Sequence, residues 1–123
     1  MIARTICRIL GVLFVIAGVI VIFRGEPADQ YHNLLHLATG LVALAIGFLG
    51  SIAAASQFCV WFGVGYLTLG VLGIVVGDPL AARLWHVGPL HLDSGDHGFH
   101  LVLGTIQLVG GLLTRRTVEA STT

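Results

Sequence analysis

Lysine is missing from this sequence, and charged residues of every kind are scarce. Six arginines balance six acidic residues, and charged residues make up only 10% of the chain, whereas a soluble domain carries about 25%. A neutral chain with so little charge lacks the positive surface that nucleic acid requires. We therefore expect no nucleic-acid partner, and we expect the lipid bilayer to be the main surroundings of the protein.

Common catalytic and cofactor motifs are also missing. The sequence has no Walker loop, no nucleophile elbow and no HExxH. Its two cysteines, Cys7 and Cys59, form neither a CxxC nor a CxxCH motif. We interpret them as apolar packing residues that stay reduced near the cytoplasmic face. These absences argue against a hydrolase, and they favour a protein that is not an enzyme.

Long apolar runs dominate what is present. Hydrophobic residues make up 56% of the chain, and no charged residue occurs between Gln30 and Gly77. A single helix of that length would be roughly 72 Å long, against a hydrocarbon core of about 30 Å. The run must therefore fold back, and the polar stretch 51–57 predicts the turn. We expect one domain, 1–123, with four membrane-spanning helices at roughly 6–23, 31–52, 58–76 and 97–113.

Two segments allow more than one interpretation. The basic start and apolar middle of the first helix resemble a cleavable signal peptide, but Glu26 stands where the cleavage site needs a small residue. The connection 78–96 has apolar residues at near-helical spacing before Pro89. This spacing predicts a short helix on the membrane surface with Trp85 at headgroup level, and a re-entrant segment is the alternative.

The arginines are distributed unevenly between the two ends of the predicted bundle. The end with both termini carries four arginines and one acidic residue, Glu119, whereas the opposite end carries two arginines and five acidic residues. The positive-inside rule then predicts that both termini lie in the cytoplasm.

Two segments match without gaps. Residues 33–44 read NLLHLATGLVAL and residues 97–108 read HGFHLVLGTIQL, so that His36 aligns with His100. A weaker match pairs Gly11 and Gly18 of the first helix with Gly63 and Gly70 of the third. The repeat predicts an all-α, four-transmembrane-helix up-down bundle built from a duplicated helical hairpin. Chance similarity between glycine-rich apolar helices is the alternative.

Small residues recur along the predicted helices at steps of four and three. The series Gly40, Ala43 and Gly47 is one example, and such seams let helix backbones approach closely in lipid. We expect the second and fourth helices to lie close together. Gln107, near mid-membrane, is expected to form a hydrogen bond across helices.

All the histidines fall at the predicted outer end of the bundle. They are His32, His36, His86, His91, His97 and His100. His32 and His36 share one helix face at i,i+4, and His97 and His100 share another at i,i+3. Asp29, Asp93 and Asp96 lie at the same level. Paired imidazoles beside carboxylates predict a zinc or copper site. Its predicted ligands are His32, His36, His97, His100 and Asp96.

Three other roles for the histidines stay open. They can relay protons or sense external pH, or they can simply form hydrogen bonds between helices. His36 and His100 can also ligate a haem iron, although glycine seams favour helices too close together for a macrocycle.

Two segments carry a family resemblance. YHNLLHLATGLVAL, a hydrophobic third helix, an outer loop and DSGDHGFHLVLG together resemble a family of small four-helix membrane proteins common in actinobacteria, classified as a domain of unknown function. The resemblance covers roughly residues 9–113, with its motifs at 33–37 and 96–100. It implies a four-helix bundle and supplies no catalytic residue.

Together these observations predict a small multi-pass protein of the bacterial inner (plasma) membrane, and they leave three functional hypotheses. The first is a structural or accessory membrane protein that associates with itself or with another membrane protein. The second is a metal-binding or proton-linked transport component that uses the outward histidines. The third is a haem-binding redox protein.

Overall fold

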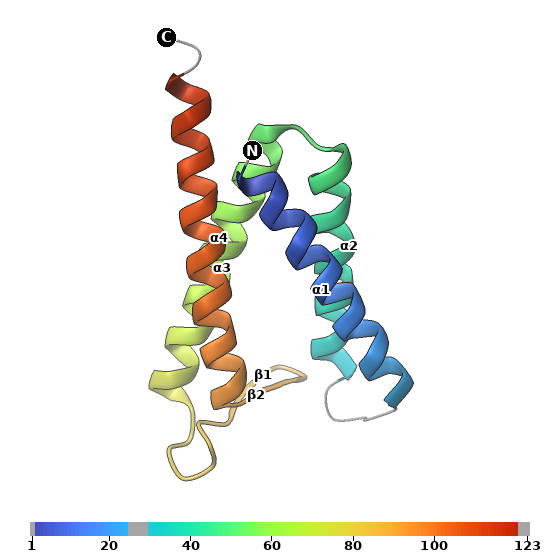
Figure 1. Ribbon diagram of the computed structural model, residues 1–123. Coiled ribbons are helices and arrows are strands. Elements are labelled where there is room, and N and C mark those ends of the chain that lie inside the picture. Colours follow the sequence, from blue (N-terminus) through green and yellow to red (C-terminus); the bar gives the residue numbers. More distant parts are fainter. Residues whose placement is uncertain (1, 25–29, 121–123) are drawn as a thin grey trace.

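Four long helices make up most of the structure. The computed structural model describes residues 2–24 and 30–120 (Figure 1). The helices are α1 (Ile2–Arg24), α2 (Gln30–Leu49), α3 (Ile52–Val76) and α4 (Ser94–Ala120). All four are long and apolar enough to cross a membrane, and they pack together. The predicted four-helix transmembrane fold is therefore confirmed.

The turn between α2 and α3 is shorter than the sequence predicted. α3 begins at Ile52 because Ser51 caps it, and the Ser51 hydroxyl accepts a hydrogen bond from the Ala54 N–H at 3.0 Å. Ser56, which the sequence placed in the turn, lies inside α3, where its hydroxyl donates to the Gly111 carbonyl of α4 at 2.8 Å. The position of this turn, predicted from polarity alone, was therefore wrong.

The helices pair within two hairpins. α1 packs mainly on α2, and α3 packs mainly on α4. The expectation that α2 and α4 pack together is wrong for the part of the chain that the structure describes. The reason lies in the glycine seams. A side chain at Gly40 would come within 3.0 Å of the Gly11 carbonyl of α1, and one at Gly104 within 2.9 Å of the Gly63 carbonyl of α3.

The two hairpins are tied together at the end that holds the termini. Thr114 of α4 accepts a hydrogen bond from the Ala3 N–H of α1 at 2.9 Å. The sulfur atoms of Cys7 and Cys59 lie 3.7 Å apart, and both cysteines are buried and free. From this end the ribbons of the two hairpins diverge towards the opposite end, where the strands β1 and β2 lie (Figure 1).

The predicted surface helix in the connection 78–96 is wrong. The segment instead contains an antiparallel pair of strands, β1 (Trp85–Val87) and β2 (Leu90–Leu92). Gly88 has φ +58° and precedes Pro89 in the two-residue turn, which suits the first central position of a type II′ turn. The alternation of apolar residues and histidine in WHV and LHL is the period-two pattern that a helical interpretation passed over.

Candidate metal centre

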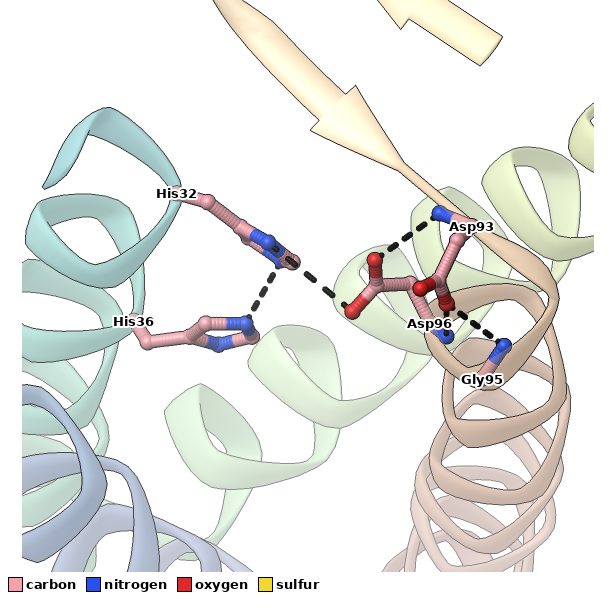
Figure 2. A network of polar contacts seen from close by, with 5 residues as sticks. All are labelled: His32, His36, Asp93, Gly95 and Asp96. Atoms are coloured by element: carbon pink, nitrogen blue, oxygen red, sulfur yellow. Dashed lines mark hydrogen bonds and ion pairs between the residues drawn. The ribbon is translucent and has the colours of Figure 1, made fainter. Parts of the chain in front are cut away.

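Two histidines of α2 lie one above the other. His32 and His36 are one helical turn apart, and their Nε2 atoms lie 2.8 Å from each other, within hydrogen-bond distance (Figure 2). Their ring centroids are 4.5 Å apart. The i,i+4 spacing therefore brings both imidazoles to the same place, on the side of α2 that faces α4.

The start of α4 holds a carboxylate beside this pair. Asp93 caps the helix, and its Oδ1 accepts hydrogen bonds from the Gly95 and Asp96 N–H groups at 2.7 and 3.2 Å. Asp96 completes the capping box, since its Oδ2 accepts from the Asp93 N–H at 3.0 Å. Its other oxygen, Oδ1, lies 3.9 Å from Nδ1 of His32 (Figure 2). The helix cap thus fixes a carboxylate behind one imidazole.

His100 joins the pair from α4. One ring nitrogen from each of His32, His36 and His100 lies within 4.8 Å of the others. His100 is buried, and its Nδ1 has no hydrogen-bond partner among the described residues. Of the predicted ligands, these three histidines are the ones whose ring nitrogens the structure brings together.

Aromatic side chains enclose the imidazoles. Phe14 of α1 contacts His36 with ring centroids 4.8 Å apart. Tyr66 of α3 stacks on His100, with the ring planes 13° apart and the centroids at 5.2 Å. All four helices therefore contribute to the surroundings of the cluster. Phe14 was not among the predicted site residues, although the weak repeat that pairs Gly11 with Gly63 also aligns Phe14 with Tyr66.

His97 does not join the other three histidines. It is fully buried, and its Nε2 donates a hydrogen bond to the Arg83 carbonyl at 2.8 Å. Its ring lies against Gly73 of α3, where any side chain would collide with it. Arg83 has φ +57°, and this left-handed turn aims its carbonyl in a direction that the sequence does not reveal. His97 thus has a packing role at the start of α4.

The remaining polar residues of the prediction lie elsewhere. His86 and His91 are exposed and face each other across the β-hairpin, with ring centroids 4.6 Å apart. Asp29 lies outside the described residues. Gln107 is buried in α4, but its Oε1 has no hydrogen-bond partner within the described chain, so the expected bond across helices is not found at that atom.

An apolar cavity of about 310 Å³ adjoins the cluster. His32, His36 and His100 line one part of it, and the rest is lined by residues of α2, α3 and β2. The apolar residues are Leu35, Trp61, Phe62, Leu69, Leu90 and Leu92, with Thr39, Gly65 and Tyr66 completing the wall. The imidazoles thus face open space on one side and protein on the other.

The donor set has a definite chemical preference. Three imidazoles suit zinc or copper, which bind neutral ring nitrogens well. A haem iron between His36 and His100 fits poorly. The two ring centroids are 6.4 Å apart, but the His32 ring lies beside the line that joins them, 4.5 and 5.9 Å from the two. His32 would therefore occupy the space of the porphyrin.

Fold and site together define a four-helix membrane protein with a histidine cluster at one end of its bundle. The chain belongs to the family described as Domain of unknown function (DUF4383), whose model matches residues 22–113. No curated protein and no solved structure matches the chain. The predicted family resemblance is confirmed, the actinobacterial origin stays a prediction, and function has to be argued from the site.

Proposed function

We propose that this protein is an accessory component of the bacterial inner membrane that binds a transition metal, zinc or copper, through His32, His36 and His100. The observation that carries the proposal is the convergence of three ring nitrogens within 4.8 Å. The i,i+4 spacing explains why the two histidines of α2 lie together, but the third ligand, His100, belongs to α4, which is far from α2 in the sequence. A site assembled from α2 and α4 would also link the two hairpins where they diverge.

The distances suit a metal after a small adjustment. Zinc binds histidine nitrogen at about 2.0–2.1 Å, so tetrahedral ligand nitrogens lie roughly 3.3 Å apart. The His32 and His36 nitrogens, at 2.8 Å, would move apart slightly, and His100 would move inward. Asp96 lies beside Nδ1 of His32, and a carboxylate in this position is a common partner of metal-ligating histidines.

The arginine distribution supports the location of this centre on the outer face of the membrane. The histidines lie at the end of the bundle opposite the termini, and the arginine-rich end is expected to be cytoplasmic. A centre of this kind would take its metal from outside the cell.

We also infer that the two hairpins are copies of one ancestral hairpin. Gly11 and Gly63, which the repeat aligns, make matching contacts. A side chain at Gly11 would meet Leu44 and the Gly40 carbonyl, and one at Gly63 would meet Leu108 and the Gly104 carbonyl. The contacts of Phe14 with His36 and of Tyr66 with His100 correspond in the same way. The proposed metal ligands His36 and His100 would then descend from one ancestral histidine.

Calorimetric titration of the purified protein with zinc and copper tests the metal centre. His32→Ala, His36→Ala and His100→Ala should each abolish binding, because each removes one of three ligands. His86→Ala and His91→Ala are the matched controls, since both histidines are exposed on the β-hairpin, and they should leave affinity unchanged.

Acid should weaken the binding. Only the neutral imidazole ligates a metal, and histidine in model peptides has a pKa of about 6.5, so protons compete increasingly below that pH. Titrations at neutral and mildly acidic pH should show the lower affinity in acid. If the wild type binds neither metal, the histidines are interhelical hydrogen-bonding groups and the structural hypothesis holds instead.

A further inference from the structure

The cavity beside the histidines opens at the side of the bundle. Leu35 of α2 and Trp61 of α3 line it and are exposed on the lipid-facing surface, Trp61 by 74%. Both helices are membrane-spanning candidates. A molecule that enters here therefore comes from the bilayer, and it must be soluble in lipid.

The wall of the cavity is mostly apolar and partly aromatic, and its polar groups include the imidazoles of the histidine cluster and the hydroxyl groups of Thr39 and Tyr66. Trp61, Phe62 and Tyr66 of α3 contribute three aromatic side chains, and such walls favour flat rings. A volume of about 310 Å³ is at the lower limit for small-molecule sites. It suits a single substituted ring and is too small for a sterol.

Hydrogen-bond counting within the histidine cluster leaves one imidazole N–H for a ligand. A neutral imidazole has a single N–H. The carboxylate of Asp96 faces Nδ1 of His32, which favours the proton there, so Nε2 of His32 accepts from the N–H of His36. The N–H of His100 then remains, in a residue that lines the cavity. A ligand for this site should offer a hydrogen-bond acceptor at one edge of its ring.

We propose that this cavity binds a lipid-soluble quinone. The ring lies between the aromatic side chains of α3, one ring oxygen accepts a hydrogen bond from His100, and the hydrocarbon tail leaves past Gly65 into the bilayer. The inference goes beyond the metal centre and does not require it, because the donor is an imidazole of the metal-free protein.

Gly65 allows the cavity to be filled without disturbing the packing. A side chain at this position meets no other atom within 4 Å, and the residue lines the cavity. Gly65→Phe should therefore occupy the space of the ring. Gly98→Phe is the matched control, since Gly98 of α4 has the same open surroundings but does not line the cavity.

Tryptophan fluorescence reports the binding directly. The chain has two tryptophans, and Trp85→Phe leaves Trp61, in the cavity wall, as the only one. Decylubiquinone added to this purified protein in detergent should quench Trp61 with saturation. Gly65→Phe should raise the Kd about tenfold or more, whereas Gly98→Phe should leave it unchanged. Zinc titrations should give the same affinity for both variants.

Decylbenzene separates ring recognition from simple occupation by a hydrocarbon chain. It has the same tail but no ring oxygen, so it should not displace the quinone at equal concentration. Equal competition by decylbenzene, or an unchanged Kd in Gly65→Phe, overturns the inference. Failure of the metal centre would appear separately, as absent zinc binding in a protein that still binds decylubiquinone.

Discussion

Asp96 uses its two carboxylate oxygens for two neighbours. Oδ2 accepts the Asp93 N–H and so belongs to the cap of α4, while Oδ1 faces the imidazole of His32. A carboxylate behind a ligating histidine orients the ring and makes its other nitrogen more basic. The residue that starts the helix therefore also prepares one ligand of the proposed metal centre.

Asp96→Asn separates these two roles. The amide oxygen can still accept the Asp93 N–H, so the helix cap is preserved, but the negative charge beside His32 is lost. We expect zinc affinity to fall roughly tenfold, measured by calorimetry. Asp93→Asn is the control, because Asp93 caps the same helix end without facing His32. Equal effects of both substitutions would contradict the role of Asp96.

Single residues of the site were predictable to different degrees. His32 and His36 follow from helical spacing, and His100 follows from its alignment with His36 in the repeat. His97 lies at the same end of α4 as His100, but its Nε2 donates a hydrogen bond to the Arg83 carbonyl instead of joining the cluster. That carbonyl is aimed by two consecutive left-handed residues, Ala82 and Arg83. Neither is glycine, so the sequence gives no sign of the turn.

At the scale of elements, glycine decides which helices meet. A side chain at Gly104 would come within 2.7 Å of the Leu67 backbone nitrogen. One at Gly40 would come within 3.0 Å of the Val15 backbone nitrogen of α1. In both cases the obstacle is backbone, which cannot rotate away. The small residues thus allow each pair of helices to approach at close range.

Gly40→Leu and Gly104→Leu should each destabilise the protein by about 1–3 kcal/mol or more, because the added side chain forces two backbones apart. Thermal unfolding in detergent, followed by circular dichroism, measures the loss. Gly98→Leu is the control on α4, where a side chain meets open space, and it should change stability by less than about 0.5 kcal/mol. Similar losses of stability at all three positions would contradict the role of the glycine seams in helix packing.

The elements themselves were predicted unevenly. Hydropathy over a span of residues is a strong signal, and all four helices were found. The β-hairpin was missed because WHV and LHL are only three residues each, too short for period-two alternation to stand out against helical spacing. The glycine seams identified faces that pack closely but not their partners, which is why α2 was paired with α4 instead of α1.

At the scale of the whole molecule, the two hairpins are in close contact at the end with the termini, the closed end, and they diverge towards the other end. Small buried residues, among them Ala3, Cys7, Ala55 and Cys59, fill the closed end. At the other end, where the hairpins diverge (Figure 1), the histidines and the cavity lie between them. A ligand or metal that bridges the hairpins there should restrict their relative motion, so both proposed sites are placed where binding can affect the whole fold.

Which side of the membrane carries these sites depends on the orientation of the chain. The end with the termini carries Arg4, Arg8, Arg115 and Arg116, and this bias predicts that it is cytoplasmic. A green fluorescent protein fused after Thr123 should then fluoresce, while a fusion after Ser94 should not, and alkaline phosphatase at the same two sites should give the opposite result. A fusion after Gly50, in the turn between α2 and α3, should behave like the fusion after Thr123, because two spans return the chain to its starting side.

Two outcomes would contradict this orientation in different ways. If the reporters at Ser94 and Thr123 gave the same result, α4 would not cross the membrane. A reversed pattern would keep the four spans but turn the histidines towards the cytoplasm, and the metal would then have to come from inside the cell.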